Sequence, residues 1–108
     1  MSITADSLVR RYRGKNINKG TVISIASQIE PSDSFIETFN QCLRTEFVYD
    51  PKLQNTIDLA KNTASDIIFS LKHEDRCKLS HAIENLKFVI DDIQCLKPSQ
   101  LDELYSVN

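Results

Sequence analysis

Apolar residues recur along most of the chain at the three- and four-residue spacing of an amphipathic α-helix. The clearest run starts behind Asp50, an N-cap residue that precedes Pro51, and continues to Lys72. The pattern therefore predicts a long helix over residues 51–72. Its apolar positions are Leu53, Ile57, Ala60, Ala64, Ile67 and Leu71.

A second long helix is expected over residues 74–97, because the same spacing returns there and Pro98 cannot continue a helix. The connection between the two long helices is short, so they must run antiparallel as neighbours. The apolar positions of the second helix are Leu79, Ile83, Leu86, Ile90 and Ile93.

The residues before this hairpin predict shorter helices. Residues 3–13 carry one apolar stripe, and Gly14 can end that helix in the left-handed conformation. Residues 21–30 have both helical spacing and strand propensity. We assign them to a helix, because a lone strand would leave its backbone groups without partners.

Two further short helices are expected on either side of the hairpin. Residues 34–47 place Phe35 and Phe39 on one helical face, where their rings would belong to the core. After the hairpin, Ser99 and Asp102 have the spacing of a capping box, which predicts a last short helix.

Together these elements predict an all-α fold, a small helical bundle of about five helices built on the antiparallel hairpin of residues 51–72 and 74–97. A chain of 108 residues with 41% hydrophobic and 26% charged side chains has the composition of one globular domain. We divide it into a basic N-terminal helix and loop (1–20), a helical core (21–97) and a short C-terminal helix or tail (98–108).

The net charge of −2 is unevenly distributed. Residues 1–20 carry five basic groups and one acidic group, whereas residues 21–50 carry one basic and five acidic groups. The basic segment either matches acidic groups of the same chain or forms a patch for an acidic partner or nucleic acid. Its members are Arg10, Arg11, Arg13, Lys15 and Lys19.

The second long helix has an unusual reverse side. At 100° per residue, four side chains of types that are often buried lie about 140° to 180° from Leu86. They either pack inside the bundle or form a docking surface for a second copy or for another protein's helix. These candidate partner-binding residues are Cys77, His81, Phe88 and Cys95.

Candidate chemistry is sparse. His73, Cys77 and His81 share one stripe, but three residues on consecutive helical turns are too far apart to hold one metal ion. The chain has no glycine-rich phosphate loop and no nucleophile motif. We therefore expect no catalytic residue, no metal and no cofactor.

Part of the N-terminal half resembles the apolar skeleton of a helix-turn-helix motif. The usual turn glycine is replaced by Glu30, which precedes Pro31, and the would-be reading helix carries Asp33 and Glu37. An acidic reading helix fits nucleic acid poorly, because phosphate neutralisation supplies most non-specific affinity. The resemblance rests on Ile25, Ala26, Ile29, Ser32, Ser34, Ile36 and Phe39.

The sequence therefore predicts a non-enzymatic protein–protein interaction module. We expect a small regulator, adaptor or inhibitor that acts by helix-surface docking on an unidentified protein and forms a homodimer. Three cysteines, no apolar leader and no membrane-length apolar run favour a cytoplasmic protein without membrane contact. The alternative is a helix-turn-helix-like nucleic-acid-binding regulator that uses the basic segment 10–19.

Overall fold

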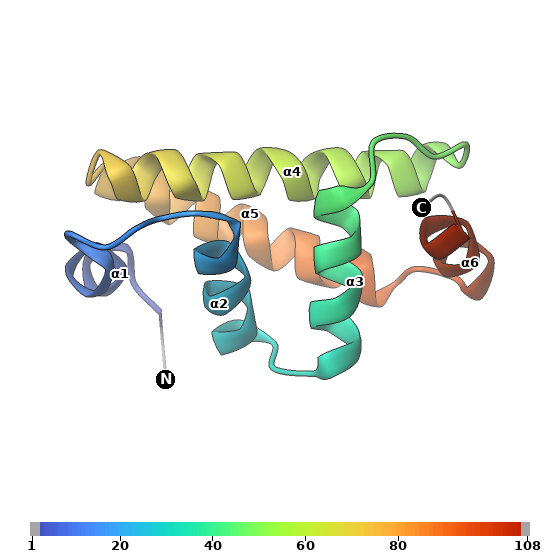
Figure 1. The fold of residues 1–108 in the computed structure, drawn as a ribbon, viewed down its shortest axis with the longest axis horizontal. Coiled ribbons are helices and arrows are strands. Elements are labelled where there is room, and N and C mark those ends of the chain that lie inside the picture. Colours follow the sequence, from blue (N-terminus) through green and yellow to red (C-terminus); the bar gives the residue numbers. More distant parts are fainter. Residues whose placement is uncertain (1–2, 107–108) are drawn as a thin grey trace.

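The computed structural model describes residues 3–106, and these residues form six α-helices and no strand (Figure 1). The predicted all-α class is confirmed, with six helices in place of about five. The ends of the predicted domain, residues 1–2 and 107–108, lie outside the described part. The helices are α1 (Ala5–Tyr12), α2 (Lys19–Ile29), α3 (Asp33–Arg44), α4 (Pro51–Lys72), α5 (Arg76–Gln94) and α6 (Pro98–Ser106).

The two long helices α4 and α5 form the predicted antiparallel hairpin, and their packing is the most extensive between any two helices described. Helix α4 has the predicted bounds. The Asp50 side chain accepts a hydrogen bond from the backbone N–H of Leu53 at 3.0 Å, and Pro51 occupies the first turn. Local capping chemistry thus sets where the hairpin begins.

The turn between α4 and α5 closes the hairpin tightly. Glu74 adopts a left-handed backbone conformation with φ of 52°. The following residue, Asp75, donates its N–H to the carbonyl of Ser70 at 2.9 Å, as in a Schellman motif. Asp75 then caps α5, because its side chain accepts from the N–H of Lys78 at 3.0 Å. We call this end of the molecule the closed end of the hairpin.

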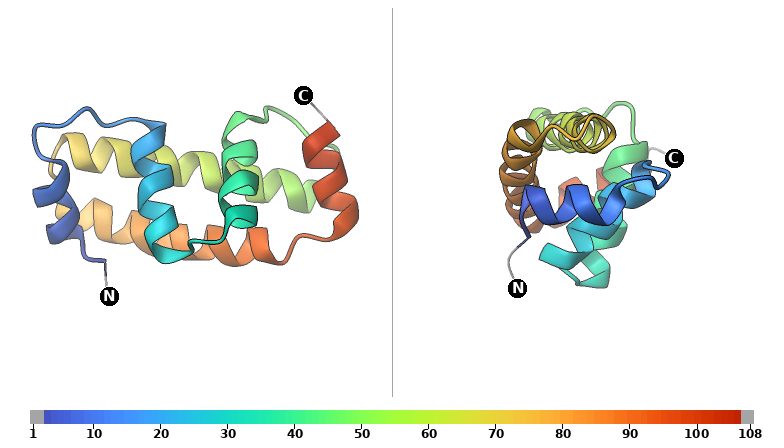
Figure 2. Two further views of the ribbon diagram at one scale, coloured as in Figure 1. Left: turned by 60° about the horizontal axis from the view of Figure 1, so that its bottom comes forward. Right: turned by 90° about the vertical axis from the view of Figure 1, so that its left-hand side faces the viewer.

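The short helices form a second layer. Helices α1, α2 and α3 lie across one face of the hairpin, and α6 lies at its opposite, open end (Figure 2). The core fills the space between the layers. Phe35 and Phe39 stack there with ring centroids 5.6 Å apart, which confirms their predicted core role. Other fully buried core residues include Leu8, Ile25, Leu53, Ile67 and Leu86.

The first two predicted helices are present, although α1 is shorter than the predicted 3–13 and α2 begins at Lys19 rather than at residue 21. Thr4 caps α1 by accepting from the N–H of Ser7 at 3.1 Å, and Gly14 follows the helix with φ of 75°. Asn18 caps α2 in the same manner, through the N–H of Gly20 at 2.9 Å. The segment that fitted both helix and strand is therefore a helix.

The bounds of the later helices α3, α5 and α6 also differ from the predictions. Helix α3 ends at Arg44 rather than near residue 47, so Phe47 lies in an extended loop. Helix α5 covers Arg76–Gln94 rather than residues 74–97, because the closing turn takes the first two positions. Helix α6 begins at Pro98, which places Ser99 inside the first turn instead of at the cap.

Candidate docking surface

The outward side of α5 is uncovered. Phe88 is 63% exposed, and Cys77, His81 and Cys95 are exposed as well. The alternative that this stripe packs inside the bundle is therefore wrong, because the short helices cover only the opposite face of the hairpin (Figure 2). By contrast, none of the apolar residues on the inward side of α5 is more than 6% exposed. They are Leu79, Ala82, Ile83, Leu86, Val89, Ile90 and Ile93.

The surroundings of Phe88 are mainly acidic. Glu84 lies one turn before it and receives a hydrogen bond from Lys87 Nζ at 3.3 Å. Asp91 and Asp92 follow about one turn later, and both are exposed. Within about one helical turn of Phe88, α5 thus carries three carboxylates and one ammonium group, the polar side chains expected at the rim of an interface.

The basic N-terminal segment is largely engaged with the chain's own polar groups. Arg13 forms an ion pair with Glu74 at 2.8 Å, and the guanidinium of Arg11 donates to the Gln28 side chain at 2.8 Å. Arg10 forms an exposed ion pair with Asp6 at 3.5 Å. These contacts favour the charge-matching interpretation of the segment.

Asp6 joins α1 to α5. Its carboxylate receives a hydrogen bond from Arg76 Nε at 2.7 Å in addition to its pair with Arg10. The hydrogen bond from Arg76, followed by the charge of Arg10, holds the pKa of Asp6 below its usual value. Asp6, the one acidic residue among residues 1–20, thus pairs with a basic residue of its own helix, α1.

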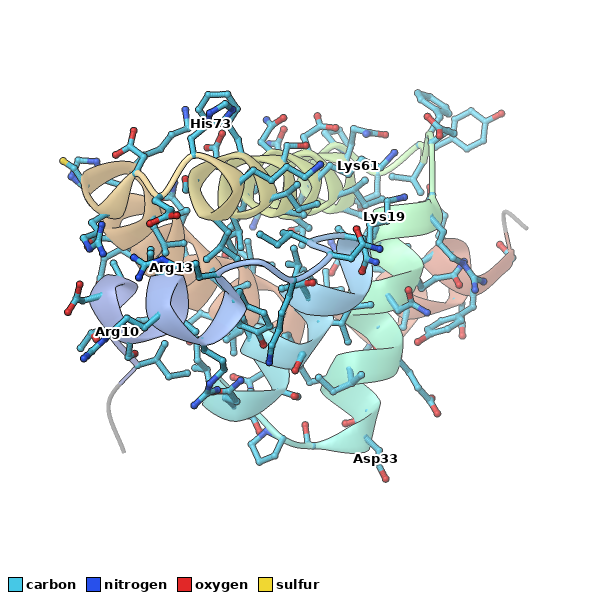
Figure 3. The ribbon with its side chains drawn as sticks, turned by 60° about the vertical axis from the view of Figure 1, so that its left-hand side comes forward. Arg10, Arg13, Lys19, Asp33, Lys61 and His73 are labelled. Carbon is cyan, nitrogen blue, oxygen red and sulfur yellow. The ribbon has the colours of Figure 1, made fainter. Side chains whose placement is uncertain are left out.

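Lys19 lies apart from the arginines of the segment. Lys19 starts α2 and lines a surface cavity together with Lys61 and Glu46, whereas Arg10 and Arg13 lie near the closed end (Figure 3). Lys61 forms an ion pair with Glu46 at 3.6 Å. The five basic residues therefore do not form one continuous patch.

The cysteines and histidines do not assemble a site. Within residues 3–106, no group of three or more potential ligands could hold a metal ion. The His73 ring contacts the Phe69 ring with centroids 4.2 Å apart, which gives this histidine an aromatic neighbour. Cys42 is buried in the core, and burial raises the pKa of its thiol to about 12.

The segment that resembles a helix-turn-helix motif is built differently. Helices α2 and α3 lie side by side and run in opposite directions across the hairpin (Figure 2). Helix α3 buries most of one side against the core, including Phe35, Phe39 and Cys42. Its exposed charged residues are Asp33, Glu37 and, at the last position, Arg44, so the surface that α3 presents has a net charge of −1.

Sequence reasoning missed one exposed feature. Phe47 and Tyr49, in the loop between α3 and α4, are 61% and 84% exposed. The signal that could have identified the loop is the run of aromatic and β-branched residues Phe47, Val48 and Tyr49 directly before Asp50 and Pro51. Such a run favours an extended chain over a helix.

Comparisons of the chain with protein-family models, with curated proteins and with solved structures find no match. In the described part of the chain, no helix combines the length and apolar character needed to cross a bilayer. The interpretation of the surface therefore depends on its own geometry and chemistry.

Proposed function

We propose that the protein is a non-enzymatic docking module that binds a helix of a partner protein through the outward face of α5, with Phe88 as its anchor. The observation that carries this proposal is the 63% exposure of Phe88 on a helix whose other apolar side chains from Leu79 to Ile93 are buried. Burial of a phenylalanine ring in a partner's pocket is a common source of binding energy at protein interfaces.

The rim indicates the chemistry of the partner. Glu84, Asp91 and Asp92 outnumber Lys87, so this face has excess negative charge. A complementary surface would carry lysine or arginine side chains around an apolar pocket. An amphipathic helix with basic flanks meets both requirements, because α5 is itself a helix of 19 residues with an exposed surface along its length.

The same charges argue against a second copy on this face. In an antiparallel pair centred on Phe88, Glu84 would approach Asp92 of the other copy. If the register moves so that Cys77 faces Cys95, Glu84 faces the Phe88 ring. The first arrangement brings two carboxylates together, and the second buries the Glu84 carboxylate against an aromatic ring with only Lys87 of its own chain as a partner; both are costly. The homodimer stays a prediction that would require another surface.

A protein that binds a partner without catalysing a reaction can act as a regulator, adaptor or inhibitor. If α5 covered the partner's active or binding site, the protein would act as an inhibitor. If it held the partner next to another protein, it would act as an adaptor. A cytoplasmic location stays a prediction from the cysteine content.

The proposal is tested by cross-linking from the exposed thiols. Cys77 and Cys95 are labelled with a benzophenone maleimide, and the labelled full chain is illuminated in an extract of its native cells. We expect one cross-linked protein, whose binding is then measured with both components purified. Phe88→Asp should weaken that binding about thirty-fold or more, the loss typical of an interface anchor.

The matched control is Phe69→Asp, because Phe69 is 49% exposed but lies on α4 near the closed end. The control should bind as the wild type does, and both variants should retain the wild-type circular dichroism spectrum. A purified partner that binds wild type and Phe88→Asp equally would contradict the proposal. Light scattering of the free chain tests the homodimer separately.

A further inference from the structure

Phe47 and Tyr49 form an exposed aromatic pair at the open end of the hairpin. Their ring centroids lie 5.3 Å apart with an edge-to-face angle of 84°. Tyr49, at 84%, is the most exposed large hydrophobic side chain among the described residues. Between them, Val48 is buried, so the backbone is fixed to the core while both rings face outward.

The loop that carries the rings is held by hydrogen bonds. The N–H of Val48 donates to the Gln54 side chain at 2.9 Å, and the N–H groups of Tyr49 and Asp50 donate to the Glu103 carboxylate. These contacts connect the loop to both α4 and α6. An aromatic pair on an anchored backbone loses little conformational entropy when it binds a ligand.

The open end is also strongly acidic. Residues 44–58 and 91–106 contain seven acidic and three basic side chains, a net charge of −4. The Glu46 side chain, next to Phe47 in the chain, is 94% exposed. This end of the molecule therefore attracts cations and repels nucleic acid.

We propose that Phe47 and Tyr49 form a second docking site, which binds an arginine-bearing segment of a partner protein. A guanidinium group stacks on aromatic faces and pairs with carboxylates, and it is more weakly hydrated than the ammonium group of lysine. The loop offers two exposed rings beside the Glu46 carboxylate, which pairs with Lys61 at 3.6 Å but is 94% exposed and can accept from a second cation. This site is separate from the α5 face and does not depend on the function proposed above.

A second copy of the chain is a poor occupant for this site. Its arginines near the closed end are already engaged: Arg13 with Glu74, and Arg76 with Asp6. Each would have to leave an intramolecular partner before it could reach the aromatic pair. An extended segment with free arginines from another protein avoids that cost.

The test is a titration with a defined probe. The isotope-labelled full chain is titrated at about 50 mM salt, where exposed charges are weakly screened. The probe is a short acetylated and amidated peptide in which arginines alternate with glycine and serine. We expect the amide signals of Val48 and Tyr49 to shift, and the double variant Phe47→Ala with Tyr49→Ala to bind about five-fold more weakly or worse.

Three comparisons make the result specific. Peptides with lysine or glutamate in place of arginine should bind more weakly, and Phe69→Ala, which removes a half-exposed ring on α4 outside both proposed sites, should leave the affinity unchanged. Equal binding by the double variant, or equal loss in Phe69→Ala, would overturn the site. Shifts at Tyr49 that depend on protein concentration without peptide would instead assign the site to a second copy.

Discussion

Asp50 connects three parts of the molecule. Its carboxylate accepts from the N–H of Leu53 at 3.0 Å, which caps α4, and from the side-chain amide of Gln100 at 3.3 Å, which lies on α6. The hydrogen bond from Leu53, followed by the bond from Gln100, lowers the pKa of Asp50 from its ordinary value of 3.8. One side chain thus fixes both the start of the hairpin and the position of the last helix.

Replacing Asp50 should therefore lower the thermal stability of the protein by an amount that depends on pH. Asp50→Ala is expected to lower the melting temperature at pH 7 by roughly 5 °C, because a capping bond is lost. The contribution is complete above the ordinary pKa of 3.8 and is lost as the pH falls through the lower folded value. Thermal unfolding should be measured from pH 7 to pH 2. The difference in melting temperature between Asp50→Ala and wild type should shrink only below about pH 4.

Asp102→Ala serves as the control for that series, since Asp102 is an exposed carboxylate on the same helix as Gln100. Its melting temperature should follow that of the wild type at every pH. A gap for Asp50→Ala that persists unchanged at pH 2 would show that the ionised carboxylate is not the stabilising group.

The sequence predicted the roles of single residues best where those roles depend on near neighbours in the chain. The cap at Asp50 and the left-handed Gly14 are set by contacts within a few residues, so local chemistry was enough to predict them. The exposure of Phe88 depends on where helices distant in sequence lie. Periodicity could identify the stripe on α5 but could not decide whether another helix covered it.

At the scale of the element, α5 has two sides with very different roles. Leu86 is fully buried against the core, whereas Phe88, two positions later, projects outward. We expect Leu86→Ala to lower the free energy of unfolding by about 3 kcal/mol, because it leaves a cavity between the layers. Phe88→Ala should change it by less than about 0.5 kcal/mol.

Urea unfolding monitored by circular dichroism measures both variants on the same scale. Similar losses of stability in the two variants would contradict the assignment of an inner and an outer side. They would indicate that the ring of Phe88 is covered in solution.

The end of α3 shows why element boundaries were harder to predict than element types. Phe47 continues the apolar spacing of Phe35 and Phe39 closely enough to extend the expected helix to residue 47. The helix nevertheless stops at Arg44, and the chain becomes extended. Hydrogen bonds from the loop backbone to Gln54 and Glu103 hold this conformation, and neither partner could be identified from the spacing around Phe47.

At the scale of the whole molecule, charge is separated along the long axis. The closed end, residues 3–18 and 65–81, has seven basic and four acidic groups, a net charge of +3. The open end has a net charge of −4, and the molecule extends 40 Å along its longest axis. The sequence blocks showed this imbalance, but only the fold shows which segments share an end.

This arrangement predicts weak contact with nucleic acid. Arg11 and Arg13 have intramolecular partners, and α3 presents acidic groups. We expect no retention of duplex or single-stranded DNA at about 150 mM salt, because too few free cations remain to neutralise phosphates. Fluorescence anisotropy with a labelled oligonucleotide checks this. Tight, salt-sensitive binding that Arg10→Ala and Lys15→Ala abolish would restore the nucleic-acid alternative.

The positions of the three thiols allow a distance to be measured along α5 in the unmutated chain. Cys77 lies in the first turn of α5 and Cys95 directly follows its last residue, so two exposed thiols stand eighteen positions apart, while Cys42 is buried in the core. Spin labels would therefore attach at two sites whose separation along the helix axis is about 27 Å, at 1.5 Å per residue. Pulsed dipolar spectroscopy on the unmutated chain could detect bending of α5 when a partner binds. Reduced mobility of one label would show which end of α5 the partner contacts.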